Sequence, residues 1–128
     1  MPREKFKTLT EQMFYVLLAL TDECCGMDIM EKVEKITDGR VKVGSGTLYN
    51  LLEQFSEEGI IAETKTEGRR RSYMLTAKGR ELLQKEYDRI MTQARDYSRV
   101  MDREVAYGTD TEKDSAKQMG YLGLSPAY

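Results

Sequence analysis

Apolar residues recur at helical spacing in the N-terminal third of the chain. Residues 10–20, TEQMFYVLLAL, are apolar on nearly all sides and follow a helix cap, either Thr10 or a capping box from Thr8 to Glu11. Residues 27–38 set apolar positions against charged ones, and Gly39 is suited to a left-handed helix stop. We expect a buried first helix and an amphipathic second helix.

A third helix is predicted from Ser45 to just before Gly59. Its apolar side chains have the i, i+3, i+4, i+7 spacing of one buried stripe: Leu48, Leu51, Leu52 and Phe55. On a wheel of about 100° per residue, Asn50 points almost directly away from that stripe. Small or polar residues lie beside Asn50: Gly46, Tyr49, Glu53 and Gln54. This outward face needs a functional explanation.

Two short segments of β character come next, IIAETKT and RRSYMLT. Glu67 and Gly68 separate them, which predicts a hairpin with its tip at 66–70. Thr76 is suited to cap a last helix that runs to about residue 105. The order predicts a mainly α fold with a small β-hairpin. It has a winged helix-turn-helix DNA-binding domain in residues 1–76 and a long C-terminal dimerisation helix in residues 77–105.

The last helix has a second periodicity. Six residues are spaced 4, 3, 4, 3, 4, an average of 3.5, as in a coiled-coil seam: Leu83, Tyr87, Ile90, Ala94, Tyr97 and Met101. We expect this seam to form the core of a homodimer. The alternative is a ligand-binding face, and both hold if the paired helices leave a gap against the first helix. Residues 106–128, rich in glycine, are predicted to be a tail, either disordered or weakly helical near 111–119.

Composition excludes several classes of function. The 128 residues include no histidine, so a Ser-His-Asp triad, a Cys-His pair and a histidine zinc site are ruled out. Cys24 and Cys25 are adjacent, cannot join distant segments and fit a reducing compartment. No apolar run reaches the about 18 residues of a membrane span, and no secretory signal is present. We expect a cytoplasmic protein that is not an enzyme and uses no cofactor and no metal.

Charge is unevenly distributed along the chain. A net charge of -2 argues against a nucleic-acid partner at face value. Lys and Arg against Asp and Glu number 6 against 8 in residues 1–40, 7 against 5 in 41–80, and 7 against 9 in 81–128. Positive charge therefore collects in the middle, at the predicted hairpin tip. There Lys65, Arg69, Arg70 and Arg71 would lie along a DNA backbone or in a minor groove, although an arginine run by itself is more often a solvated loop.

The third helix carries side chains suited to the DNA major groove. Small or hydroxyl residues that let its backbone approach phosphate stand at its start: Gly44, Ser45, Gly46 and Thr47. Asn50 and Gln54 are the candidates for base contacts, because side-chain amides pair bidentately with adenine. Thr47 and Tyr49 are expected to reach phosphate, as is Lys42 just before the helix. The alternatives are an ordinary solvated surface for Asn50 and Gln54, and a half-buried packing role for Tyr49.

These stretches resemble the PadR-like family of transcriptional regulators, over roughly residues 9–105. The resemblance rests on "YVLLAL", on the stretch from Cys25 to Glu63, and on "GRRRSYMLTAKGRELL". Gly46 to Tyr49 match the GTLY signature of the family's recognition helix. Another family pattern, R-x-Y-x-L-T-x-x-G, is matched by Arg71, Tyr73, Leu75, Thr76 and Gly79. Through that pattern Tyr73 joins the predicted DNA-binding residues.

The resemblance implies a homodimeric repressor in a bacterial or archaeal cytoplasm. Its partner would be a double-stranded DNA operator near its own gene or a neighbouring one, and a small aromatic or drug-like effector would release it. Two departures limit the implication. Cys25-Gly26-Met27 stands where the family usually has His-Gly-Tyr, and the chain lacks the tryptophan of some members' inter-subunit drug pocket, so multidrug binding is not implied.

Two further hypotheses stand beside a DNA-binding regulator. The same helix and wing could serve a protein-interaction adaptor that does not recognise a DNA sequence. Salt separates the two, because a DNA binder that neutralises about 6 phosphates loses on the order of a thousandfold in affinity between about 50 and 200 mM salt. The paired thiols of Cys24 and Cys25 at a helix start suggest redox sensing, and the alternative is that they are small buried residues at a turn.

Overall fold

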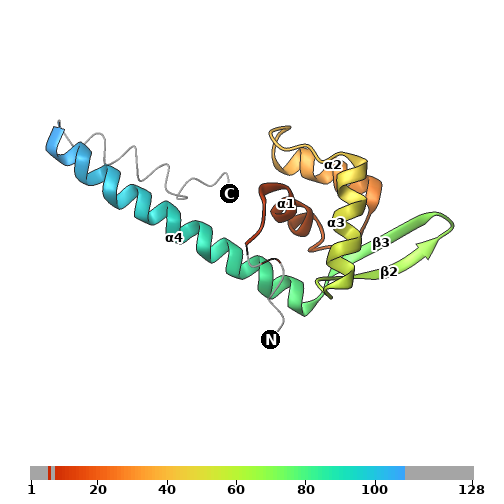
Figure 1. Ribbon diagram of the computed structural model, residues 1–128. Helices are drawn as coiled ribbons and strands as arrows, with labels where there is room; N and C mark the ends of the chain where they lie inside the picture. The colour runs from red at the N-terminus through yellow and green to blue at the C-terminus, as the bar shows by residue number, and fades with distance from the viewer. Residues whose placement is uncertain (1–5, 7, 109–128) are drawn as a thin grey trace. The chain divides into compact units, whose positions relative to one another are not determined.

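The computed structural model of the chain describes residue 6 and residues 8–108 (Figure 1). Its elements in chain order are α1 (Glu11–Ala19), β1 (Cys24–Cys25), α2 (Gly26–Ile36), α3 (Ser45–Glu57), β2 (Ile61–Glu67), β3 (Arg70–Leu75) and α4 (Ala77–Gly108). The predicted fold, mainly α with a small sheet and a long last helix, is confirmed. Residues 106–108 continue α4, and the rest of the predicted tail lies outside the described residues.

The first three helices share one apolar core. α1 begins at the N-cap Thr10, whose Oγ1 accepts the Met13 N–H at 3.2 Å. The least exposed side chains of the three helices meet in this core: Val16, Leu17, Leu20, Ile29, Val33, Leu48, Leu52 and Phe55. Figure 1 shows α3, in yellow, beside α1 and α2. The apolar stripe of α3 therefore faces inward, and its opposite face, with Asn50, is exposed.

The sheet contains a strand that the sequence analysis missed. β1 pairs antiparallel with β3, so that the strand order is β1-β3-β2 instead of a two-stranded hairpin. Two residues are too few to show the alternating pattern by which a strand is predicted. In the register of β1 and β3, Cys24 lies opposite Tyr73 and Cys25 lies opposite Ser72. The strand that leads into α2 is thereby hydrogen-bonded to the base of the wing.

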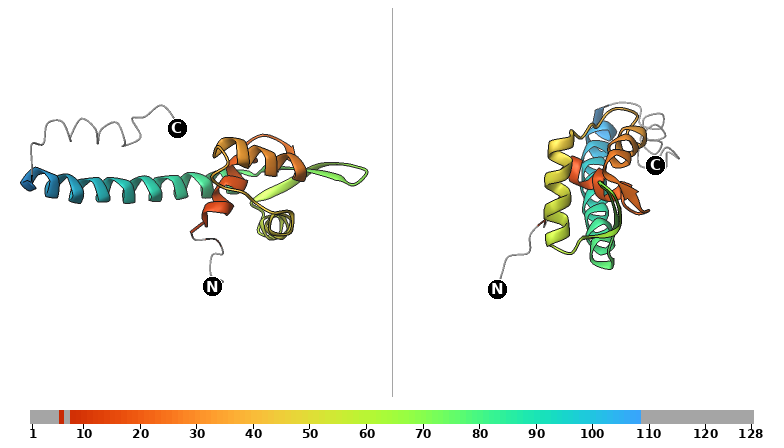
Figure 2. Two further views of the ribbon diagram at one scale, coloured as in Figure 1. Left: turned by 90° about the horizontal axis from the view of Figure 1, so that it is seen from above. Right: turned by 90° about the vertical axis from the view of Figure 1, so that its right-hand side faces the viewer.

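The wing is the hairpin of β2 and β3. Gly68 has φ +61 in the turn between them, a value suited to the tight two-residue turns of hairpins. A register shift between Glu63 and Lys65 marks a β-bulge in β2. Figure 2 shows the hairpin extending past the helices of the winged-helix unit. Every residue from 62 to 71 is exposed, so the tip is available to a partner.

The start of α4 is held against the winged helix by close backbone contacts. Thr76 Oγ1 accepts the Gly79 N–H at 3.1 Å and donates to the Ile60 carbonyl oxygen at 3.0 Å. A Cβ added at Gly79 would lie 2.1 Å from that same carbonyl oxygen, so no side chain fits there. The Leu9 N–H donates to Oε2 of the buried Glu86 at 2.8 Å. The first turns of α4 therefore belong to the winged helix.

The contacts divide the chain into two compact units, and the boundary lies inside α4 between Glu86 and Tyr87. Leu83 falls in the first unit, where it is partly buried against the apolar core together with Leu82. Its place in the dimerisation seam stays a prediction. The first turns of α4 use apolar side chains to close the winged helix.

The described part of the second unit exposes most of the remaining seam. Tyr87, Ile90 and Tyr97 are 50%, 40% and 67% exposed. Ala94 and Met101 are partly covered, and Val100, which the seam prediction did not include, is exposed as well. None of the helices in residues 8–108 is long and apolar enough to cross a membrane.

Candidate nucleic-acid interface

The first turn of α3 presents bare backbone to the outside. Ser45, Gly46 and Thr47 are all exposed, and the N-cap Gly44 has no side chain that could satisfy the first amides. No acidic residue lies in this turn. Because unpaired amides and the helix dipole both favour an anion, this end of α3 is suited to a phosphate group.

The fold does not require glycine at position 44 or 46. A Cβ added at either position would meet no other part of the protein within 4 Å, and neither residue has a positive φ. Glycine within a helix costs up to about 1 kcal/mol relative to alanine. Gly79 is different, since the fold itself leaves no room for a side chain there. Close approach by a partner outside the chain is a physical reason for Gly46 in the first turn of α3, whereas Gly44 is the N-cap, a position that accepts glycine readily.

The side chains predicted to contact bases lie along the same face. Asn50 is exposed, and Gln54, one turn further on, is partly buried. Within the described residues, neither side chain, nor that of Thr47, makes a hydrogen bond or an ion pair with another group of the protein. Their donors and acceptors are therefore available to a partner.

Tyr49 leans from α3 toward the start of α2. It is 51% exposed, and a Cβ added at Gly26, the first residue of α2, would lie 2.7 Å from its hydroxyl oxygen. Part of the ring is thus covered while the rest faces outward. The packing role and the phosphate contact, two alternatives for Tyr49 in the sequence analysis, are compatible with each other in this position.

Two basic residues precede α3, and both have acidic neighbours. Lys42 Nζ lies 3.9 Å from a carboxylate oxygen of Glu34. Arg40 donates to Glu11 Oε1 at 2.6 Å and to the Tyr15 hydroxyl at 2.8 Å. The hydrogen bond to Glu11, and after it the one to Tyr15, raises the pKa of Arg40 above its ordinary value. Arg40 is therefore held by its hydrogen bonds to α1. The ion pair of Lys42 with Glu34 is longer and weaker, so Lys42 can exchange it for a phosphate contact.

Two of the wing's four cations, Lys65 and Arg71, are paired with the protein's own carboxylates. Lys65 Nζ lies 3.9 Å from Glu23 and 3.4 Å from Glu67, and Arg71 Nε lies 3.5 Å from Glu63. The sequence analysis did not identify these acids. The spacing of Lys65 and Glu67 on one strand face was a usable signal for that pair. The contact of Lys65 with Glu23 had no such signal in the sequence, because it depends on the packing of β1 beside the wing.

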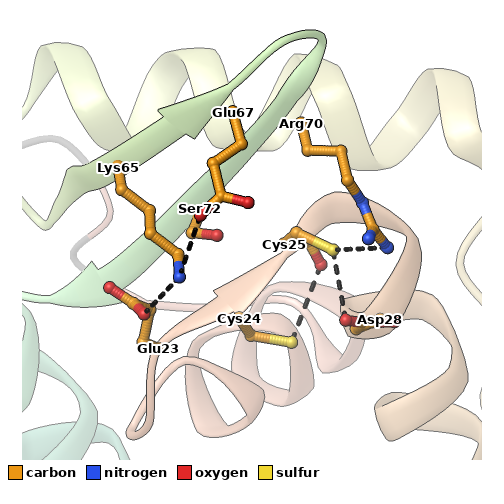
Figure 3. Close-up of a pocket in the computed structure, with 8 residues that line it drawn as sticks. All are labelled: Glu23, Cys24, Cys25, Asp28, Lys65, Glu67, Arg70 and Ser72. Atoms are coloured by element: carbon orange, nitrogen blue, oxygen red, sulfur yellow. Dashed lines mark hydrogen bonds and ion pairs between the residues drawn. The ribbon is translucent and has the colours of Figure 1, made fainter.

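Arg70 faces a pocket of about 210 Å³ between the wing and the start of α2 (Figure 3). Its Nη2 donates to Cys25 Sγ at 3.7 Å, and the Cys25 thiol donates to Asp28 Oδ2 at 3.1 Å. Besides Arg70 and Lys65, the pocket is lined by three carboxylates, those of Glu23, Asp28 and Glu67. This excess of negative charge disfavours a phosphate inside the pocket. Arg69, in the turn, is exposed and makes no ion pair with a described residue.

The two cysteines have different surroundings. Cys24 is buried, and burial raises the pKa of its thiol, which disfavours the reactive thiolate. Cys25 is half-buried and engaged with Arg70 and Asp28. Redox sensing by the pair stays a hypothesis. Among the described residues, no three Cys, Asp or Glu side chains are placed so that they could hold a metal ion.

Tyr73 does not join the predicted DNA-binding face. Its side chain is only 9% exposed and belongs to the apolar core, on the strand between β1 and β2. The alternation of β3 explains this, because Tyr73 and Leu75 point to the core. We therefore regard Tyr73 as a core residue that supports the wing.

Comparison with known proteins identifies the class. The model of the transcriptional regulator PadR-like family matches residues 16–85, more than half of the chain, and the chain belongs to this family. A search of curated proteins found no match. The protein is therefore a DNA-binding transcriptional regulator.

Solved structures share the fold at low sequence identity. RosR of H. salinarum has a TM-score of 0.60 at 18% identity over 82% of this chain and 100% of its own. A PadR-family regulator from Eggerthella lenta has a TM-score of 0.60 at 18% identity, over 70% of this chain and 80% of its own. ZitR of Lactococcus lactis, a zinc-responsive MarR family member, has a TM-score of 0.54 at 16% identity, over 93% of this chain and 76% of its own. These similarities concern the fold alone.

Proposed function

We propose that the protein is a dimeric, sequence-specific repressor that binds a double-stranded operator through α3 and the wing and is released by a small-molecule effector. The observation that carries the proposal is the first turn of α3. No side chain caps its first amides, and the fold has room for a side chain at Gly44 and at Gly46. Asn50, further along the same face, is exposed and makes no hydrogen bond within the described residues. Its site of action would be the cytoplasm, where the operator lies.

The base contacts are assigned to Asn50 and Gln54, and the phosphate contacts to the start of α3, Tyr49, Lys42 and the wing. An amide side chain at position 50 can bond adenine at two atoms in the major groove. Phosphate contacts hold the helix in register and contribute most of the salt-dependent affinity. The chain has no histidine and, among its described residues, no group of side chains that could hold a metal ion. We therefore propose binding and not catalysis.

Fluorescence anisotropy tests the DNA part of the proposal. A labelled duplex from upstream of the protein's own gene is titrated at several salt concentrations, with an unrelated duplex as control. Neutralisation of about 6 phosphates predicts on the order of a thousandfold loss of affinity between about 50 and 200 mM salt. Tight binding with preference for the upstream duplex is the expected result. Weak and equal binding of both duplexes, erased by salt, would favour the protein-interaction adaptor and direct the search to protein partners.

Dimerisation is assigned to the exposed seam of α4 after Glu86. Tyr87, Ile90 and Tyr97 expose apolar surface along one helix face, with Ala94 and Met101 between them. A second copy of the same helix would cover this surface and place two recognition helices about one DNA turn apart. Sedimentation equilibrium of the wild type and of Ile90→Glu tests this. Ile90→Glu should be monomeric, and Thr92→Glu, on the opposite helix face, should remain dimeric. A monomeric wild type at micromolar concentration would exclude the assignment.

Effector release is the part of the proposal that rests on the family resemblance. The tyrosines and Met101 of the same seam would line any gap between two paired α4 helices, and such side chains suit an aromatic ligand. A panel of small aromatic compounds added to the protein–operator complex should contain one that lowers the anisotropy. The same compound should raise the melting temperature of the free protein. Release without binding to the free protein would indicate an effect on the DNA.

A further inference from the structure

We infer that Gly26 is a positioning residue for DNA binding: its missing side chain lets the Tyr49 ring lie against the start of α2, with the hydroxyl held where a backbone phosphate passes. The inference rests on the proposed function, in which α3 enters the major groove. It adds a residue from another helix to the recognition apparatus. Nothing in the sequence pattern of α2 pointed to this role.

The contact between Gly26 and Tyr49 is specific in geometry. A Cβ on Gly26 would lie 2.7 Å from the Tyr49 hydroxyl oxygen, closer than real Cβ contacts are found, and 3.1 Å from two ring carbons, tighter than most such contacts. Gly26 has no positive φ, so its backbone does not require glycine. The space taken by the tyrosine is therefore the physical reason for glycine at this position. Because the ring end can swing away, a side chain at 26 would displace Tyr49 and leave the backbone in place.

The hydroxyl group of Tyr49 is available to a partner in this position. Its hydroxyl makes no hydrogen bond to another group in the described part of the chain, and half of the side chain is exposed. A ring whose hydroxyl end lies against Gly26, with the hydroxyl itself free of hydrogen bonds, is a preorganised donor, which loses little conformational freedom on binding. An unanchored tyrosine on α3 would lose more.

The surroundings favour a phosphate contact at this hydroxyl. The N-cap of α2, Cys25, provides no side-chain hydrogen bond to the first amides of the helix, which leaves them as donors beside the ring. Arg70 reaches Cys25 from the wing and adds positive charge there. Asp28 lies in the first turn of α2, and its carboxylate repels an anion that comes close to it. A phosphate bound at the Tyr49 hydroxyl, which is uncharged, avoids this repulsion. One backbone phosphate contacted by Tyr49 fits this arrangement.

A double-mutant cycle on operator affinity tests the inference. We expect Gly26→Ala to lower the affinity about tenfold, the effect of one lost hydrogen bond to a charged group, and Tyr49→Phe to do the same. The double variant should lose no more than either single variant, since all three lack the same contact. The Gly26→Ala protein should melt at or above the wild-type temperature, because alanine favours a helix more than glycine does. Ile36→Ala, at the other end of α2, is the control that should bind as the wild type does.

An NMR measurement on the free protein adds a readout independent of DNA. Nuclear Overhauser contacts between the Tyr49 ring protons and the Gly26 Hα protons are expected in the wild type, and the contacts of the ring with the Hα proton at position 26 should be lost in the Gly26→Ala variant. Wild-type affinity in Gly26→Ala, or additive losses in the double variant, would overturn the inference and leave the proposed function standing. Absence of operator preference in the wild type itself would remove the proposed function and the inference together.

Discussion

The recognition helix and the wing offer DNA two different kinds of surface. α3 exposes Asn50 and its first amides with no internal partner among the described residues. In the wing, by contrast, Lys65 and Arg71 already pair with Glu23, Glu63 and Glu67. In the proposed function α3 would bind DNA without breaking internal contacts, whereas Lys65 and Arg71 of the wing would have to exchange carboxylates for phosphates. A count of basic residues in the wing therefore overstates its contribution to affinity.

The difference has a physical basis in the net charge of the chain. With 22 acidic and 20 basic residues, a cluster of arginines at a hairpin tip finds carboxylates nearby. Exposed pairs of this kind contribute only about 0–1 kcal/mol each, so they exchange readily with a polyanion. The loss of an ion pair within the protein nevertheless reduces the binding free energy that each cation gains from a phosphate. Specificity is thus expected to reside in α3 and a modest part of the affinity in the wing.

The largest expected effect is that of Asn50→Ala. Loss of a bidentate amide contact should lower operator affinity by about 1–3 kcal/mol and leave binding to unrelated DNA unchanged. Anisotropy titrations of both duplexes at one salt concentration measure the two affinities. The matched control is Glu57→Gln, on the C-terminal half of α3. An equal loss on both duplexes would mean that Asn50 contacts phosphate, and the assignment of specificity to α3 would then fail.

Gly46→Ala should separate fold stability from DNA binding. Since a Cβ at this position meets nothing else in the protein, the free energy of unfolding should rise by up to about 1 kcal/mol. Operator affinity should fall, by about tenfold, because the methyl group keeps a phosphate from the amides. Chemical denaturation and anisotropy give the two quantities. A stabilised protein with unchanged affinity would show that the first turn of α3 stays clear of the DNA backbone.

Arg69 and Arg71 should differ although they are near neighbours. Arg69 makes no ion pair with a described residue, so Arg69→Ala should lower affinity for all duplexes and reduce the slope of log K against log salt by about 0.9. Arg71→Ala should have a smaller effect on both, because Arg71 gives up Glu63 on binding. Salt titrations of the two variants measure the slopes. Equal slopes would show that the ion pair within the wing has no influence.

The smallest expected effect is a gain. Glu63→Gln removes the carboxylate from Arg71, and affinity for any duplex should rise by an amount within the about 0–1 kcal/mol of an exposed ion pair. The matched control is Glu31→Gln on α2, whose carboxylate pairs with Lys35 away from the wing. Anisotropy at low salt is the most sensitive measurement. A gain of equal size in the control would point to overall charge and not to the wing.

Local patterns in the sequence were sufficient for most of the elements. The stripe of Leu48, Leu51, Leu52 and Phe55 predicted the buried face of α3, and all four residues are buried. Thr76 caps α4 as expected, with its Oγ1 bonded to the Gly79 N–H. These predictions succeed because a helix face and a cap depend on residues three or four positions apart. The same reasoning placed Asn50 on the exposed side of α3.

The features that the sequence analysis missed share one cause. β1, the burial of Tyr73, the packing of Leu83 against the winged-helix core and the contact of Gly26 with Tyr49 all join residues far apart in the chain. The spacing of apolar residues within one segment does not indicate which other segment packs against it. The ion pair of Lys65 with Glu23 belongs to the same group.

The sequence by itself therefore determined the order of elements, the exposed face of α3 and the concentration of arginine at the wing, because each follows from local spacing. The tertiary structure decided which of those side chains are engaged. It paired Lys65 and Arg71 of the wing with acids, placed Tyr49 on Gly26 and left the start of α3 open. The physical reason is that hydrogen bonds and ion pairs are made in space, between segments whose proximity only the packed core establishes.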